Sequence, residues 1–303
     1  MIAALALAAA AAVLQAQPIL TIGPKHRIVE GIASDGKTMF VSSIIDRKLL
    51  ACTTTQCRTF AVTPPGLHPF GIAWDAMRKR LWVAASCPKG VPGIVACERG
   101  ALLGYDARGR LMTRVASAGG TFLPGDVSVS SAGVFVSDSS NGAVHRLADG
   151  ARRLEIVLGA GIGKSGQGSA LSVDGKTLIV ADYAQGIAAI DLASGTRVLL
   201  PRVGGKPLRG IDGLVRCGST YYGLYNGASP GTLVAITRSG NEIAVEQPLG
   251  ELVLADPTQV AIDGDRLLIV ADSGWATIGE AGFVRSLGTV IMAVDVPGGC
   301  TGG

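Results

Sequence analysis

Short apolar runs alternate with polar turns along the whole chain, a pattern typical of β-hairpins. Residues 166–183, GQGSALSVDGKTLIVADY, give the clearest example, with a tight turn at 173–176 between two β-rich runs. The same unit recurs with openings at Glu30, Phe70, Gly125, Gln167, Asp212 and Thr258. Successive openings lie 40 to 55 residues apart, which is the period of propeller blades and not of helical solenoids. The pattern therefore predicts an all-β fold, a six-bladed β-propeller with four-stranded antiparallel blades around a central channel.

The N-terminal segment differs from the repeats. After Met1, residues 2–14 are all Ala, Leu, Ile or Val, a stretch too short to cross a bilayer and typical of the core of a signal peptide. A cleavage point after Ala16 predicts a signal peptide over residues 1–16 and a single propeller domain over residues 17–303. No later stretch has eighteen uninterrupted apolar residues, so we expect no membrane span. The expected location is outside the cytoplasm, either periplasmic or secreted.

Composition narrows the set of partners. The 43 Gly and 14 Pro among 303 residues suit a fold with many turns. The net charge of +4 is spread along the chain without a basic run, so we expect no nucleic-acid partner. The expected partner is a small-molecule substrate or ligand, and the expected state is a monomer.

The chain has six cysteines, which in an exported protein favour disulfides over metal thiolates. Two pairs bracket short local segments and the third joins the cysteines that remain: Cys52 with Cys57, Cys87 with Cys97, and Cys217 with Cys300. Spacing alone does not choose among the many connectivities that six cysteines allow.

The openings of the repeats suggest where chemistry takes place. The first strand of each propeller blade lines the central channel, so the residues that open the six repeats should form a ring at one mouth. In this ring Glu30, Gln167 and Asp212 would direct two carboxylates and one amide toward one axis. Such oxygen ligands suit Ca²⁺, Mg²⁺ or Mn²⁺. Two like charges in a confined channel need either a cation or a raised pKa.

These residues also carry a resemblance. The LIVADY and LIVADS endings, Glu30 before Gly31, and Asp212 before Gly213 resemble the gluconolactonase and senescence-marker-protein (regucalcin) family of six-bladed propellers, over roughly residues 30–296. The resemblance implies one divalent cation on Glu30, Gln167 and Asp212, with Ca²⁺ favoured over Mg²⁺, Mn²⁺ and Zn²⁺. It also implies that Asp212 is the catalytic base that activates water against a lactone.

The sequence departs from the family pattern at three positions. Gln167 stands where the family has Asn, Gly125 stands where an Asn precedes the Asp that is here Asp126, and Leu123 replaces a common Arg. The resemblance therefore supports lactone hydrolysis more directly than it supports sugar-acid lactones as the substrates.

Further residues are candidates for binding substrate. His68 enters the second repeat, Asp126 lies in the third, and Arg209 precedes Asp212 by three residues, so each is expected to reach the channel mouth or to have a structural role instead. Trp275 lies in a long turn that could cover the channel or pack as an ordinary aromatic. Three further acids each end the second apolar run of a repeat: Asp138, Asp182 and Asp272. An Asp at such a position commonly caps a turn.

Three functions remain open on the sequence. The first is a metal-dependent hydrolase of a small lactone or related ester. The second is a noncatalytic exported propeller that binds a small ligand or a protein. The third is a different propeller chemistry, such as that of strictosidine-synthase-like proteins, with the key carboxylate elsewhere in the channel.

Overall fold

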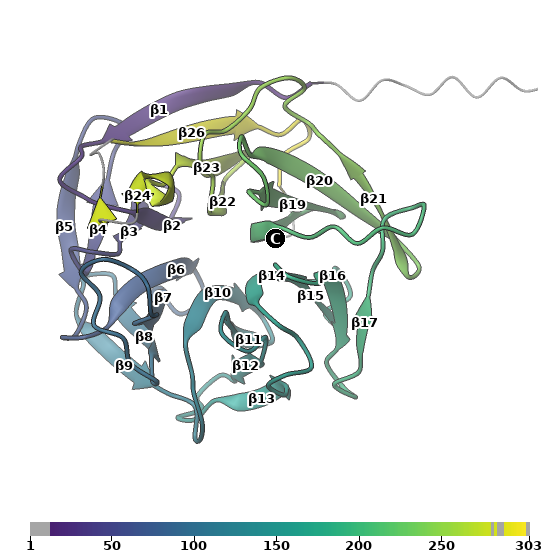
Figure 1. Ribbon diagram of the computed structural model, residues 1–303, viewed down its shortest axis with the longest axis horizontal. Coiled ribbons are helices and arrows are strands. Elements are labelled where there is room, and N and C mark those ends of the chain that lie inside the picture. The colour runs from purple at the N-terminus through teal and green to yellow at the C-terminus, as the bar shows by residue number, and fades with distance from the viewer. Residues whose placement is uncertain (1–12, 280–281, 284–287, 301–303) are drawn as a thin grey trace, which may run out of the picture.

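The computed structural model describes residues 13–279, 282–283 and 288–300. Six four-stranded antiparallel sheets stand in a ring around a central channel (Figure 1). The predicted six-bladed propeller is therefore confirmed. The only helix in the described residues is a single 3₁₀ turn, η1 (Trp275–Thr277). Within that part of the chain no helix has the length and hydropathy needed to cross a bilayer.

Each of the first three blades is built from four consecutive strands. Blade 1 contains β2 (Val29–Ser34), β3 (Met39–Ser43), β4 (Lys48–Cys52) and β5 (Cys57–Val62). Blade 2 contains β6 (His68–Asp75), β7 (Arg80–Ser86), β8 (Ala101–Asp106) and β9 (Leu111–Val115). Blade 3 contains β10 (Pro124–Ser130), β11 (Gly133–Asp138), β12 (Val144–Leu147) and β13 (Glu155–Leu158).

The last three blades continue the series. Blade 4 contains β14 (Gly166–Leu171), β15 (Thr177–Asp182), β16 (Gly186–Asp191) and β17 (Arg197–Leu199). Blade 5 contains β18 (Ile211–Cys217), β19 (Thr220–Tyr225), β20 (Thr232–Ser239) and β21 (Glu242–Glu246). Blade 6 contains β22 (Val260–Asp263), β23 (Arg266–Asp272), β26 (Thr289–Asp295) and β1 (Ala16–Ile22). Between β23 and β26 lies a small hairpin of β24 (Ile278–Gly279) and β25 (Gly282–Phe283).

The ring is closed by strands from both ends of the chain. β1 pairs antiparallel with β26, so the outermost strand of blade 6 comes from the N-terminal side (Figure 1). Just before β1, the Leu14 amide donates to the Pro248 carbonyl at 2.7 Å. Residues 1–12 of the expected signal peptide lie outside the described residues.

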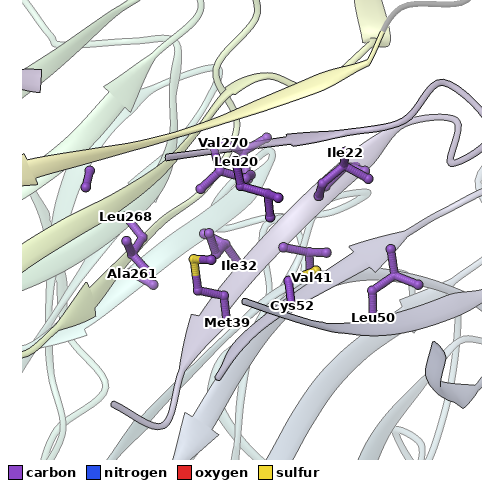
Figure 2. Packing of buried hydrophobic residues seen from close by; sticks show 13 residues of the cluster. Leu20, Ile22, Ile32, Met39, Val41, Leu50, Cys52, Ala261, Leu268 and Val270 are labelled. Carbon is purple, nitrogen blue, oxygen red and sulfur yellow. The ribbon is translucent and has the colours of Figure 1, made fainter. Parts of the chain in front are cut away.

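The core consists of side chains packed between neighbouring blades. Figure 2 shows the cluster where blade 6 meets blade 1: Leu20 and Ile22 of β1 lie over Ile32 of β2 and Val41 of β3. Met39 and Val41 of β3 belong to this cluster, whereas Phe40 of the same strand packs against blade 2. Alternate side chains of one strand thus give a blade an apolar face toward each neighbouring blade. This packing holds the first strands in place around the channel.

The three expected disulfides are confirmed, and no free cysteine is found in the described residues. Cys52–Cys57 closes the β4–β5 turn and Cys87–Cys97 closes the insertion that precedes β8. Cys217–Cys300 ties the C-terminal segment to β18.

Candidate functional site

The openings of the repeats meet at one mouth of the channel, around a cavity of about 380 Å³ that we call the mouth cavity. Five of the six openings line it: Glu30, Phe70, Gly125, Gln167 and Asp212. Residues from connections between strands complete it: Ser139, Ser165, Tyr183, Asn226, Asp256 and Trp275. The structure therefore brings together the three predicted metal ligands.

A repeated irregularity of the first strands places these side chains. The β2–β3, β14–β15 and β18–β19 ladders each shift register at the opening, with Glu30, Gln167 and Asp212 inside the shifted stretches. A β-bulge leaves the extra residue out of regular pairing and redirects its side chain. The same local device thus turns one oxygen-bearing side chain from each of three blades into the mouth cavity.

Glu30 and Asp212 are two half-buried acids that line the same cavity. Burial, followed by the negative charge of Asp212, raises the pKa of Glu30 well above its ordinary value, although a hydrogen bond from Trp275 opposes this. Burial, followed by the charge of Asp126, raises the pKa of Asp212 to about 7. Both carboxylates are therefore costly to ionise unless a positive charge joins them.

Asn226 fixes the orientation of Asp212. Its Nδ2 donates to Asp212 Oδ2 at 3.0 Å and to the Pro257 carbonyl at 2.8 Å. Because both partners are acceptors, the amide nitrogen of Asn226, and not its oxygen, must face them. The other atom, Asn226 Oδ1, is buried and has no hydrogen-bond partner among the described residues. Asn226 therefore presents an acceptor that the protein itself leaves unused.

Gln167 and Gly125 fit together. Gln167 Nε2 donates to Ser165 Oγ at 3.3 Å, which leaves its Oε1 as the atom available to a ligand. A Cβ on residue 125 would lie 3.4 Å from Gln167 Oε1 and 2.9 Å from Ser139 Cβ. The Gln167 oxygen would stay in ordinary contact with such a Cβ, whereas Ser139 would have to move, so the close approach that favours glycine here is to Ser139.

Asp256 and Trp275 form a second layer around Glu30. Asp256 Oδ2 accepts from Ser273 Oγ at 2.7 Å and from the Ala276 amide at 3.0 Å, so it holds the turn that carries Trp275. Trp275 Nε1 in turn donates to Glu30 Oε2. The carboxylate of Glu30 is therefore positioned from the blade 6 side.

The donor set fits a hard divalent cation. Glu30 and Asp212 supply charged oxygens, Gln167 and Asn226 supply neutral ones, and none of the described residues lining the cavity is Lys, Arg or His. Oxygen ligands of this kind suit Ca²⁺, Mg²⁺ or Mn²⁺ better than Zn²⁺. No cluster of three or more His, Cys, Asp or Glu that could hold a metal occurs in the described residues. Cation binding here would thus depend on the amide oxygens as well as the acids.

Asp126 lies deeper in the channel and does not line the mouth cavity. Its Oδ1 accepts from Gln259 Nε2 at 2.6 Å and from the Val127 amide at 2.7 Å. Burial raises its pKa to about 7, against the lowering effect of these two donors. Asp126 and Gln259 line a separate cavity of about 580 Å³, formed by later residues of the first strands.

Close approach of backbones makes this contact possible. A Cβ on Gly71 would lie 2.0 Å from Asp126 Oδ1, and one on Gly213 would lie 2.4 Å from Gln259 Oε1. Glycine in two blades thus makes room for the longer side chains of the neighbouring blades. The Asp126–Gln259 hydrogen bond joins blades 3 and 6 inside the channel.

The other two candidate substrate-binding residues lie elsewhere. His68 is buried, and its Nδ1 lies 2.8 Å from the Ile44 carbonyl, so Nδ1 carries the proton and donates. Burial lowers the pKa of His68. Arg209 lines a separate groove of about 650 Å³ beside blade 5. Neither side chain lines the mouth cavity.

The predicted turn-capping role is confirmed for two acids. Asp138 accepts from the Leu123 and Ser140 amides at 3.0 and 2.9 Å. Asp182 accepts from the Lys164 amide at 2.8 Å and pairs with Arg197 at 3.2 Å. These contacts satisfy the two acids inside the blade turns.

Sequence reasoning missed several lining residues, but a signal for them exists. Ser139, Tyr183 and Asn226 occupy equivalent places just beyond β11, β15 and β19. Aligning the ends of the second strands, in addition to the openings of the first, would have found this second ring. Gln259 directly follows the sixth opening, Thr258, as Asp126 follows the third opening, Gly125, whereas glycine follows each of the other openings, so the same alignment would have found it. Asp256 has no such signal because its partners come from a later turn.

Comparison with solved structures supports the fold. Gluconolactonase from Xanthomonas campestris matches with a TM-score of 0.63 and 19% identity, over 98% of this chain and 94% of that chain. Regucalcin from Agrobacterium tumefaciens, a calcium-binding protein, matches with a TM-score of 0.60 and 15% identity, over 92% and 96%. The PQQ-bound aldose sugar dehydrogenase from Streptomyces coelicolor matches with a TM-score of 0.62 and 13% identity, over 95% and 99%.

No protein-family model and no curated protein matches the sequence. The predicted likeness to the gluconolactonase and regucalcin propellers is thus confirmed as a likeness of fold. At these identities the three proteins share an architecture on which different chemistries are built.

Proposed function

We propose that this protein is a hydrolase of a small lactone or related ester that depends on one divalent cation at the mouth cavity. The observation that carries the proposal is the pair of half-buried acids, Glu30 and Asp212, which line one cavity with Gln167 and have no basic partner among its described lining residues. Two of the solved structures of the same fold are described as a gluconolactonase and a calcium-binding protein.

The chain's own residues have separable roles in this mechanism. Glu30, Gln167 and Asp212 would hold the cation, with Ca²⁺ favoured; when bound it polarises the ester carbonyl and lowers the pKa of water. Asn226 holds Oδ2 of Asp212, so Oδ1 is the atom that accepts a proton from the attacking water. The water oxygen forms a bond to the carbonyl carbon as that proton moves to Asp212. The ring C–O bond then breaks, and Asp212 returns the proton to the leaving oxygen to give a hydroxy acid.

The three disulfides favour an oxidising compartment because such bonds are rare in the cytosol. Export to the periplasm or the exterior is therefore part of the proposal. Finding the signal segment removed from purified extracellular or periplasmic protein would support it.

Hydrolysis of a lactone panel tests the function directly. Metal-stripped protein is assayed by acid release with and without Ca²⁺, Mg²⁺ or Mn²⁺, beside Asp212→Asn and the matched variant Asp182→Asn. We expect cation-dependent turnover in the wild type and in Asp182→Asn, and none in Asp212→Asn. If the wild type hydrolyses nothing with any of the three cations, the noncatalytic ligand-binding propeller replaces this proposal.

A further inference from the structure

The mouth cavity has two unlike walls. Ser139, Ser165, Gln167 and Tyr183 form a polar wall on the side of blades 3 and 4. Phe70 and Trp275 form an aromatic wall on the other side, with ring centroids 6.4 Å apart and planes inclined by 27°. The carboxylates of Glu30 and Asp212 also line this cavity, so a bound molecule meets acids, a polar wall and an aromatic wall together.

The aromatic wall is a packed structure. Phe70 is buried in a cluster with Ile28 and Ile44, and Trp275 packs against the same cluster. Val91 and Ile94 also pack there, and both lie in the loop closed by the Cys87–Cys97 disulfide. A wall supported in this way is formed before a ligand binds, which lowers the ordering cost of binding.

The aromatic wall offers no free hydrogen-bond donor among the described residues. The phenyl ring of Phe70 has none, and the indole N–H of Trp275 is already donated to Glu30. A sugar hydroxyl placed against this wall would lose its water partners without replacement, which is unfavourable. An aromatic or aliphatic substituent would instead gain contact with the rings.

Charge and size limit the ligand further. Glu30, Asp212 and Asp256 all line the cavity, and no Lys, Arg or His is among its described lining residues, so the protein offers no partner to an anionic substituent. The volume of about 380 Å³ lies at the small end of the usual range for ligand sites. A lactone ring with one ring-sized substituent is of suitable size.

We propose that the substrate is an uncharged lactone or ester that carries an aromatic or apolar substituent, which Phe70 and Trp275 bind. That the ligand is hydrolysed rests on the proposed function. That the aromatic wall prefers an aromatic or apolar substituent does not depend on hydrolysis.

The test compares matched lactones and matched variants. Cation-loaded protein is assayed with δ-phenyl-δ-valerolactone, δ-methyl-δ-valerolactone and glucono-δ-lactone. We expect the highest kcat/KM for the phenyl lactone, by about tenfold over the methyl lactone, which is the order of one aromatic contact with the added burial of the ring. Phe70→Leu keeps an apolar side chain and removes the ring, so it should erase most of that ratio while the methyl lactone is still hydrolysed.

Phe60→Leu is the control variant. Phe60 also contacts an aromatic neighbour, Phe40, but it packs between blades 1 and 2 and does not line the mouth cavity. The phenyl-to-methyl ratio should stay at the wild-type value in this variant. Equal losses for both lactones in Phe70→Leu, or a preference for glucono-δ-lactone in the wild type, would overturn the inference and leave the hydrolase proposal standing.

A binding measurement separates the two proposals. Saturation-transfer NMR is recorded with phenyl-substituted tetrahydropyran, an ether that cannot be hydrolysed, and with unsubstituted tetrahydropyran. Phe70-dependent binding of the phenyl ether by a protein that hydrolyses no lactone would support the aromatic wall and refute the hydrolase. No preference for the phenyl ether in the wild type would refute the aromatic wall, whatever the lactone assay shows.

Discussion

Acids at the blade turns and acids at the channel mouth are held in opposite ways. Asp182, only 4% exposed, accepts from backbone amides and pairs with Arg197. Asp212 has one side-chain donor, Asn226, and its pKa is raised by burial first and by acidic neighbours second. Satisfied acids of the first kind stabilise a turn, whereas poorly compensated acids of the second kind mark a place where a ligand supplies the missing charge.

The size of a cavity does not distinguish satisfied acids from poorly compensated acids. The larger cavity of about 580 Å³ also contains a buried acid, Asp75. Arg78 pairs with Asp75 at 2.8 Å, and Trp82 Nε1 donates to it at 3.1 Å. Asp126, the other buried acid of this cavity, accepts from Gln259 Nε2 and from the Val127 amide. The smaller mouth cavity is the better candidate site because three acids, Glu30, Asp212 and Asp256, line it together with no basic residue among its described lining residues.

Removing the charge of Asp212 should have the largest effect. We expect Asp212→Asn to lower lactone hydrolysis by at least about a hundredfold, since it removes the proton acceptor, and to weaken cation binding. Without a cation its resistance to urea should not fall, because the substitution relieves repulsion among buried acids. Retained hydrolysis in this variant would show that Asp212 is not the base.

The raised pKa values predict an unusual pH dependence of stability in metal-free protein. The pKa of Asp212 and of Asp126 is raised to about 7 from 3.8, so between about pH 4 and 7 the folded state binds more protons than the unfolded state. The free energy of unfolding should thus fall as pH rises through this window and level off above it. Urea unfolding at several pH values checks this.

Asp212→Asn should flatten part of that slope, and saturating Ca²⁺ should flatten the same part in the wild type, because Asp126 lies outside the mouth cavity. Stability that rises with pH across the same window in metal-free protein would contradict the raised pKa values.

Asp182→Asn should have a moderate effect confined to stability. Loss of the ion pair with Arg197 and weakening of the bonds to backbone amides should lower the free energy of unfolding by about 1–3 kcal/mol. Cation affinity should be unchanged, as calorimetry would report. A loss of cation binding without a loss of stability would show that Asp182 acts at the cation site and not in a turn.

Gln167→Asn should have the smallest effect. The shorter amide keeps its oxygen and reaches one methylene less far toward a cation. We expect cation binding to persist and hydrolysis to be retained or improved. Loss of both in a folded variant would show that the additional methylene of Gln167 is required.

The sequence predicted the parts of the molecule that repeat. Six hairpins gave the blades, and aligning their openings gave Glu30, Gln167 and Asp212, because a shift of register recurs at the same point of blades 1 to 5. The closing strand β1 was not predicted, since it is a single strand whose partner, β26, lies at the other end of the chain. The Asp126–Gln259 contact was missed because it crosses the channel between repeats.

Calcium titration of metal-free protein by isothermal calorimetry tests the central claim most directly, with Glu30→Gln and Asp182→Asn measured beside the wild type. We predict one bound cation per chain in the wild type and in Asp182→Asn, and much weaker binding in Glu30→Gln. Absence of binding in the wild type at millimolar Ca²⁺, Mg²⁺ and Mn²⁺ would contradict the claim that the acids of the channel mouth hold a cation.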